Sequence, residues 1–168
     1  MYNSTDCYAV SSVPGPMGND VHLPEFLQCG YAESYLDTNN LWMSSGDTKS
    51  VIHNDDQDNL NCVFSGSKRL IFFHPGNKSS IESKECGGVI ADELRQEHPQ
   101  YEAYGAFNGN IDVDDMDLIK YPGWNSLPWW DAALEPGDCV FIPTYWYHHV
   151  NSKGRSMAVN SWWWRSDH

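Results

Sequence analysis

Residues 137–150 read GDCVFIPTYWYHHV: a Gly-Asp turn, a short β-prone run, and an aromatic segment that ends in two adjacent histidines. Other short β-prone runs occur at 41–43, 50–53, 61–64, 69–73 and 156–160, and turn-forming residues separate them at 44–47, 65–67 and 135–138. Many short strands with regular turns are typical of a sandwich or barrel. We therefore predict a mainly β fold with a few short helices.

Two segments far apart in the sequence carry residues that bind metals. His53 and Asp55 lie two residues apart at the end of the 50–53 run, so both side chains can leave the same face of a strand. A third ligand must come from another strand, and His148 or His149 offers it. Because side chains alternate along a strand, only one of this pair can face inward. Two histidines and one carboxylate suit Fe(II), because they leave coordination positions open for a cosubstrate and O2.

Neither segment is decisive alone. In so acidic a chain, a histidine is followed by an aspartate two positions later fairly often by chance. The His148-His149 pair is equally compatible with a half-exposed histidine pair on an aromatic-rich edge. The combination of the two segments on β-prone runs is what favours a metal site.

Length and charge restrict the function classes. The 168 residues suit one domain with its own hydrophobic core. Ten Lys plus Arg against 23 Asp plus Glu give a formal net charge of −13, and no basic cluster exceeds Lys68-Arg69, so we expect no direct nucleic-acid partner. We also expect neither a membrane span nor a signal peptide, because no apolar run is long enough for either.

The five cysteines show no CxxC spacing and are odd in number, so we expect neither a zinc knuckle nor a complete disulfide framework. This favours a reducing, intracellular compartment. Two tripeptides, which begin at Asn3 and Asn77, fit the glycosylation acceptor pattern and would matter only in a secreted protein. The localisation therefore stays open.

We predict a single domain over residues 1–168, with a core at about 38–165 and an extended lead-in over 1–37 that carries one or two helical turns. A less regular insert lies between Pro75 and Trp130, with a helix expected over Ile90–Glu97. The acidic run at 112–117 lacks the glycine and the terminal glutamate of an EF-hand loop, so we expect a solvated acidic turn.

These motifs resemble those of JmjC-domain hydroxylases of the cupin-like kind. The 137–150 segment is similar to the segment that closes the metal site in that family, and residues 50–55 are similar to its first-ligand strand. Asn59 and Lys68 follow His53 by 6 and 15 residues, where the family carries an asparagine and a lysine. The run from Ala158 to Trp162 resembles the family's last core strand. The matches cover about residues 38–165.

The resemblance implies a double-stranded β-helix, or jelly-roll, with Fe(II) as cofactor and 2-oxoglutarate as cosubstrate. It selects His148 as the third metal ligand, beside His53 and Asp55. The distal carboxylate of 2-oxoglutarate needs a cation and a hydroxyl donor in an otherwise apolar barrel. Lys68 suits the first role and Ser50 the second.

Other residues near the expected site have two interpretations each. Asn59 and Asn160 could bind the cosubstrate or only satisfy backbone groups at strand edges. Trp42, with Trp146 and Trp162, could wall the pocket or only pack in the core.

We therefore expect an Fe(II)- and 2-oxoglutarate-dependent oxygenase that hydroxylates a protein or peptide side chain, rather than a histone demethylase, because the chain has no reader module or zinc motif. The net charge favours a basic substrate segment. Two alternatives stay open: a non-catalytic cupin-like interaction module, and a metal cupin enzyme that does not use 2-oxoglutarate. The sequence leaves the oligomeric state and the target residue undecided.

Overall fold

The structure, a computed structural model, describes residues 8–28, 30, 34–87 and 111–165. Within these ranges the strands are β1 (Tyr8–Ser12), β2 (Leu36–Ser44), β3 (Thr48–Lys49), β4 (Asp58–Phe73), β5 (Trp130–Leu134), β6 (Cys139–Ile142) and β7 (Tyr147–Trp163). They form one antiparallel sheet in the order β1-β2-β7-β4-β5, with β3 beside β7 and β6 beside β4. The predicted mainly β fold is confirmed, and it is compatible with a jelly-roll.

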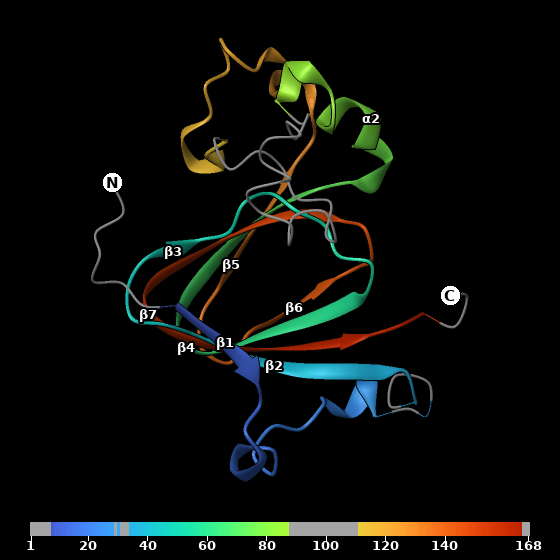
Figure 1. Cartoon of the computed structure of the whole chain (residues 1–168), viewed down its shortest axis with the longest axis vertical. Helices are drawn as coiled ribbons and strands as arrows, with labels where there is room; N and C mark the ends of the chain where they lie inside the picture. The colour runs from blue at the N-terminus through green and yellow to red at the C-terminus, as the bar shows by residue number, and fades with distance from the viewer. Residues whose placement is uncertain (1–7, 29, 31–33, 88–110, 166–168) are drawn as a thin grey trace, which may run out of the picture.

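The two longest strands, β4 and β7, bend and fold the sheet into two facing layers (Figure 1). Their pairing shifts register between Val63 and Ser67. Gly66 lies in this bend with φ +75°, and Gly154 lies near the matching point of β7 with φ +63°. A Cβ atom on Gly66 would lie 2.5 Å from the carbonyl oxygen of Arg155, so this close approach of two strands requires glycine.

Each layer combines half of each long strand with shorter neighbours. The upper layer of Figure 1 contains β5, residues 68–73 of β4, residues 147–152 of β7, and β3. The lower layer contains β6, residues 58–63 of β4, residues 156–163 of β7, β2 and β1. We use these names below.

The strands differ from the prediction in three places. The runs at 61–64 and 69–73 belong to a single strand, and the predicted turn at 65–67 is its bend. The run at 50–53 is not a strand, and only His53 makes an isolated bridge, to His148. Strands β1, β3 and β5 were not predicted. The β5 sequence, Trp-Asp-Ala-Ala-Leu, is poor in the β-branched residues that mark strands.

Short helical turns lie outside the sheet: Gly15–Met17, Glu25–Leu27, Pro75–Asn77, Lys84–Cys86, Val113–Asp115 and Pro122–Ser126, which are 3-10 turns, and α2 (Lys78–Ile81), which is one turn of α-helix. The turn at Glu25–Leu27 falls where the lead-in was expected to carry one. The helix expected over Ile90–Glu97 lies outside the described residues. In the part of the chain that the structure describes, no helix is long and apolar enough to cross a membrane.

Two apolar clusters cover the two faces of the upper layer. Between the layers lie Val63, Leu70, Phe72, Leu134 and Ile142. On the outer face, under α2 and the 111–127 segment, lie Ile52, Ile71, Phe73, Ile81, Cys86, Ile111, Trp124, Leu127 and Tyr147 (Figure 1). Because both faces of β4 are covered here, residues 70–73 are apolar without alternation.

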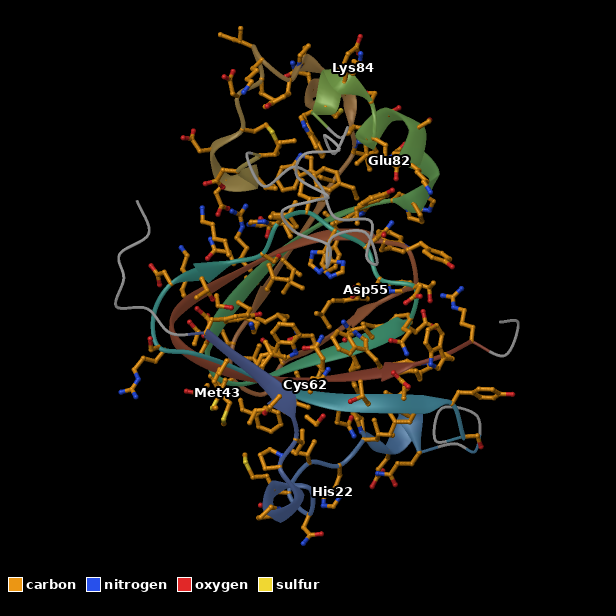
Figure 2. All side chains as sticks on the ribbon, viewed as in Figure 1. His22, Met43, Asp55, Cys62, Glu82 and Lys84 are labelled. Carbon is orange, nitrogen blue, oxygen red and sulfur yellow. A yellow bond between two sulfur atoms is a disulfide. The ribbon has the colours of Figure 1, made fainter. Side chains whose placement is uncertain are left out.

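A disulfide joins Cys62 of β4 to Cys139 of β6 in the lower layer, and Figure 2 labels Cys62 there. Among the described residues, Cys86 is a free and buried thiol. The sequence did not indicate this disulfide, because the two cysteines are brought together by the pairing of β4 with β6 and not by their spacing in the chain. Cysteine usage therefore no longer favours a reducing compartment.

Candidate active site

His53, Asp55 and His148 lie together at the inner face of the upper layer. Each offers a ligand atom, and these atoms lie within 4.8 Å of one another. The two imidazole rings have centroids 4.2 Å apart, and His148 Nε2 lies 3.7 Å from Asp55 Oδ2. His148 belongs to β7, whereas the other two lie on the segment that leads into β4, where Figure 2 labels Asp55. These residues could hold one metal ion.

Backbone carbonyls fix the orientation of both imidazoles. His53 Nδ1 lies 2.8 Å from the oxygen of Val51, and His148 Nδ1 lies 3.0 Å from the oxygen of Trp146. A carbonyl can only accept a hydrogen bond, so each Nδ1 carries the proton and donates it. Each Nε2 then keeps its lone pair for a metal, as is usual for ligating histidines.

The turn that precedes β7 is hydrogen-bonded to the segment that carries His53 and Asp55. The N–H of Tyr145 donates to the carbonyl oxygen of Asp55 over 2.8 Å, and Tyr145 adopts a positive φ of 66° to do so. Asp58 accepts from the N–H and Oγ1 of Thr144 at 2.8 and 3.0 Å, and from Arg165. The position of Asp55 is thus tied to the turn that starts β7.

Burial shifts the pKa values of His148 and Asp55 away from their charged forms. Burial, with His53 as a second cause, lowers the pKa of His148 to about 3. Burial raises the pKa of Asp55. A divalent cation favours neutral imidazole and ionised carboxylate, so it would keep His148 in the form that burial already selects and offset the shift of Asp55.

His149 faces the opposite side of β7. Its Nε2 lies 3.8 Å from Asp114 Oδ2 on the outer face, and neither ring nitrogen has a hydrogen-bond partner in the described ranges. Asp114 also pairs with Lys49 at 2.9 Å and Arg69 at 3.1 Å, and it accepts from Asn151 at 2.8 Å. We call these five residues the Asp114 cluster.

The acidic run at 112–117 is exposed to solvent, as expected of a solvated acidic turn, and Asp114 in addition pairs with residues of the sheet. Burial alone would raise the pKa of the Asp114 carboxyl, but the hydrogen bonds from Lys49 and Asn151 hold it below its usual value. The sequence could not indicate this, because the partners of Asp114 lie on β3, β4 and β7. The acidic run therefore anchors the insert to the sheet.

The inner face of the upper layer carries three rows of side chains across β5, β4 and β7. From the metal group toward the bend, the rows are Trp130, Phe72 and His148; Ala132, Leu70 and Val150; and Leu134, Lys68 and Ser152. Lys68 thus lies two rows from His148, about 13 Å along the strand. An apolar row separates the candidate metal group from the lysine.

Lys68 is a buried cation at the far end of these rows. Its residue is 6% exposed, its Nζ donates to Ser152 Oγ over 2.7 Å, and it forms no ion pair with any residue in the described ranges. Burial lowers the pKa of Lys68 to about 8. A buried ammonium is costly unless it is paired, so the position suits an anionic ligand.

The lower layer faces this space with polar groups. Asn61 Nδ2 donates to Asn160 Oδ1, and Asn160 Nδ2 donates to Asn59 Oδ1, each over 2.7 Å. Asn61 Oδ1, Trp42 Nε1 and Trp162 Nε1 are buried and have no hydrogen-bond partner among the described residues. Such unpaired buried groups are rare, and they mark a place for a bound ligand or water. The residues present therefore fit a polar cosubstrate between the layers.

The remaining expected residues are placed as follows. Ser50 Oγ accepts the N–H of Val150 over 2.8 Å, which leaves its hydroxyl proton to donate elsewhere. Trp42 and Trp162 make an edge contact with ring centroids 6.2 Å apart. Sequence reasoning missed Asn61 and Ser152. Asn61 follows Asn59 at the two-residue period of a strand, a usable signal, whereas Ser152 is found only from the register of β4 and β7.

The fold and this site define a class of metal-binding β-barrel proteins, and comparisons agree. Residues 4–168 match the family described as Cupin-like domain, so the chain belongs to the cupin-like family. JmjC members of this family use Fe(II) and 2-oxoglutarate, which confirms the expected family and cofactors.

Three relatives show the range of named activities. The chain is 31% identical over 146 residues to lysine-specific demethylase JMJ31 of Arabidopsis thaliana. This alignment covers 86% of this chain and 23% of the relative. It is 27% identical over 144 residues to tRNA wybutosine-synthesizing protein 5 of Homo sapiens (86% and 38%). It is 25% identical over 140 residues to the human bifunctional peptidase and (3S)-lysyl hydroxylase JMJD7 (76% and 42%). The chain spans less than half the length of these relatives.

Proposed function

We propose that this chain is an Fe(II)- and 2-oxoglutarate-dependent oxygenase that hydroxylates a side chain of a protein or peptide, with release of succinate and CO2. One observation carries the proposal. A His-Asp-His group and a buried lysine that has no ion-pair partner among the described residues occupy the same inner face of one sheet, two rows apart. That is the arrangement a short dicarboxylate needs if one end meets a metal and the other a cation.

The metal ligands in this proposal are His53 and His148 through Nε2, and Asp55 through its carboxylate. Bound Fe(II) with 2-oxoglutarate supplies the activation of O2 and the oxidation of a C–H bond. The chain's own contribution is to hold both imidazoles in one tautomer through the carbonyls of Val51 and Trp146, so that no proton must leave Nε2 when the metal binds.

The cosubstrate contacts in this proposal come from both layers. Lys68 pairs with the distal carboxylate of 2-oxoglutarate, Ser152 orients the ammonium, and Ser50 donates its hydroxyl proton. Asn59, Asn160 and Trp42 face the cosubstrate from the lower layer, where the unpaired Nε1 of Trp42 and Oδ1 of Asn61 await partners. Exclusion of water by the apolar row strengthens each polar contact.

The substrate in this proposal is a basic protein or peptide segment. The net charge of −13 attracts cations and repels phosphate backbones, which disfavours nucleic acid, although one relative is named for tRNA. Two of the relatives quoted above are named for lysine. Demethylation is hydroxylation at an N-methyl carbon, so the same site serves both outcomes, and we favour the simpler hydroxylation.

The first test is succinate release from 2-oxoglutarate by protein that is loaded with Fe(II) anaerobically and then exposed to O2. We expect turnover in wild type. We expect losses of about a hundredfold in His148→Ala, which removes a metal ligand, and in Lys68→Ala, which removes the cation for the cosubstrate. His149→Gln is the matched control and keeps turnover, because His149 belongs to the Asp114 cluster on the outer face, away from the metal group.

Two further readouts separate the alternatives. Anaerobic charge-transfer absorption reports formation of the Fe(II) and 2-oxoglutarate complex without any need for substrate, and thermal unfolding shows that each variant is folded. Metal binding with no dependence on Lys68 would favour a metal cupin that does not use 2-oxoglutarate. Absence of both metal and 2-oxoglutarate binding would favour the non-catalytic interaction module.

A further inference from the structure

Aromatic side chains gather on the side of the metal group that faces away from Lys68. Trp130 shares the row of His148, as its register with Phe72 shows. Trp146 precedes His148 by two residues, and its ring centroid lies 5.3 Å from that of Trp130. The cosubstrate would occupy the Lys68 side, which leaves the side of the metal group next to these two tryptophans for a substrate.

The two indoles form a corner that remains open to solvent. Their planes are inclined by 59°, and Trp130 is 47% exposed while Trp146 is half-buried. His74 also packs edge-on against Trp146, with ring centroids 5.1 Å apart and planes inclined by 72°, and helps to hold its ring in place. Two indoles that contact each other and stay partly exposed form a contiguous apolar surface, and such surfaces mark binding sites.

The net charge of the protein favours a cationic occupant. The chain as a whole carries a net charge of −13, and the exposed Asp56 follows Asp55 of the metal group. Indole faces bind ammonium and guanidinium groups better than the faces of other aromatic side chains do. A neutral side chain of the same shape would make apolar contact with the indoles but would lack this electrostatic attraction.

We propose that Trp130 and Trp146 form an aromatic wall that positions a lysine or arginine side chain of the substrate peptide beside the metal group. This inference rests on the proposed function and adds to it the residues that select the substrate. Trp130 is the positioning residue with the larger exposed face, and Trp146 also orients His148 through its carbonyl oxygen. The substrate side chain would therefore contact a residue that also orients a metal ligand.

The test uses protein loaded with Zn(II), which is diamagnetic and supports no turnover, in the presence of 2-oxoglutarate. Peptides of the form acetyl-Gly-Ser-X-Ser-Gly-amide, with lysine, arginine, norleucine or citrulline at X, are titrated while the indole N–H resonances of ¹⁵N-tryptophan are followed. We expect the lysine peptide to bind about tenfold more tightly than the norleucine peptide, and arginine more tightly than citrulline to the same degree. Trp130 and Trp146 should show the largest shifts.

Variants assign the effect. Trp130→Leu should remove the preference for the charged peptides, and Trp130→Phe should retain part of it. Trp129→Leu is the control: Trp129 is an exposed tryptophan that precedes β5, and its loss should leave the preference intact. Equal binding of charged and neutral peptides, an unchanged preference in Trp130→Leu, or no binding of any peptide would overturn the inference.

Failure of this inference is distinguishable from failure of the proposed function. Succinate release with no charge preference in binding would remove the aromatic wall and leave the oxygenase. Selective binding of charged peptides without succinate release under Fe(II) and O2 would leave the aromatic wall and remove the oxygenase.

Discussion

Lys68 is the residue that best connects burial to function. A lysine ammonium away from water loses solvation that one serine hydroxyl cannot replace, and burial lowers its pKa from 10.5 to about 8. A carboxylate placed beside Lys68 favours the charged form and would raise that pKa again. Binding of an anionic ligand and protonation of Lys68 are therefore linked.

This linkage predicts how the affinity for 2-oxoglutarate depends on pH. Below pH 8 the ammonium of the free protein is already charged, so the affinity should be flat. Above pH 8 the free protein has lost this proton and must regain it on binding, so the affinity should fall by up to about tenfold per pH unit. Calorimetry in buffers of different ionisation enthalpy measures both the affinity and the proton uptake.

Lys68→Arg supplies the control for this prediction. A guanidinium stays charged throughout the range, so the step near pH 8 should disappear even if the affinity is lower. An identical pH profile in wild type and in the arginine variant would show that another group takes up the proton.

Among the individual residues of the site, the sequence predicted those that the spacing within one segment identifies. The two-residue spacing of His53 and Asp55 predicted that their side chains converge. The segment is not a strand, but the structure brings both side chains within reach of His148. The resemblance was needed to choose between the adjacent histidines and to single out Lys68. Ser152 and the partners of Asp114 were out of reach, because pairings across strands depend on register, which no single segment encodes.

Among the elements, the bent strand β4 matters most. Asn59 and Lys68 are nine residues apart, so a regular strand would place them on opposite faces. The register shifts between Val63 and Ser67, with the bend at Gly66, turn both side chains into the interior between the two halves. The sequence indicated this bend as a turn at 65–67. It could not indicate that pairing with β7 continues through it, because β7 bends at the same place.

Gly66→Ala should therefore be far more damaging than Gly154→Ala. Both residues have positive φ, which costs an alanine about 1–2 kcal/mol. At Gly66 the new Cβ also meets the backbone of Arg155 and Ser156 at 2.5 and 2.8 Å, whereas nothing lies within 4 Å of the site at Gly154. We expect losses of roughly 3 kcal/mol or more and about 1 kcal/mol, respectively, in the free energy of unfolding.

Urea denaturation of the two variants measures this difference, with similar m values as the sign that both unfold from a native fold. Equal losses would mean that β7 moves away from Gly66 at little cost, and that the close approach of the two bends is not what shapes the interior.

For the molecule as a whole, the Cys62–Cys139 disulfide is the longest-range covalent constraint in the described residues, with a sequence separation of 77. It joins β4 to β6, and β6 leads into the turn that holds Asp55 and begins β7. Closing a loop of this length removes conformational entropy from the unfolded chain, worth about 4–5 kcal/mol on the chain-entropy estimate.

Reduction with a dithiol should therefore lower the Tm by roughly 10 °C, since about 2–4 °C accompanies each kcal/mol in a chain of this size. Differential scanning calorimetry with and without reductant measures the shift. The Cys62→Ser, Cys139→Ser double variant should unfold at the reduced Tm and ignore the reductant. A wild-type Tm that does not respond would mean that the two thiols are unpaired in solution.

The pairing of Phe72 with Trp130 has a consequence for how such a protein can change over time. The chain leaves β4 and re-enters at β5 as immediate neighbours, with Cα atoms about 5 Å apart across the ladder. The segment between Phe72 and Trp130 therefore connects two neighbouring strands, as a hairpin loop does, whatever its length. Recombination could replace this whole segment, provided that the new segment supplied a carboxylate for Lys49 and Arg69. The barrel that carries the His-Asp-His group and the insert that covers its outer face could then change independently within a single gene.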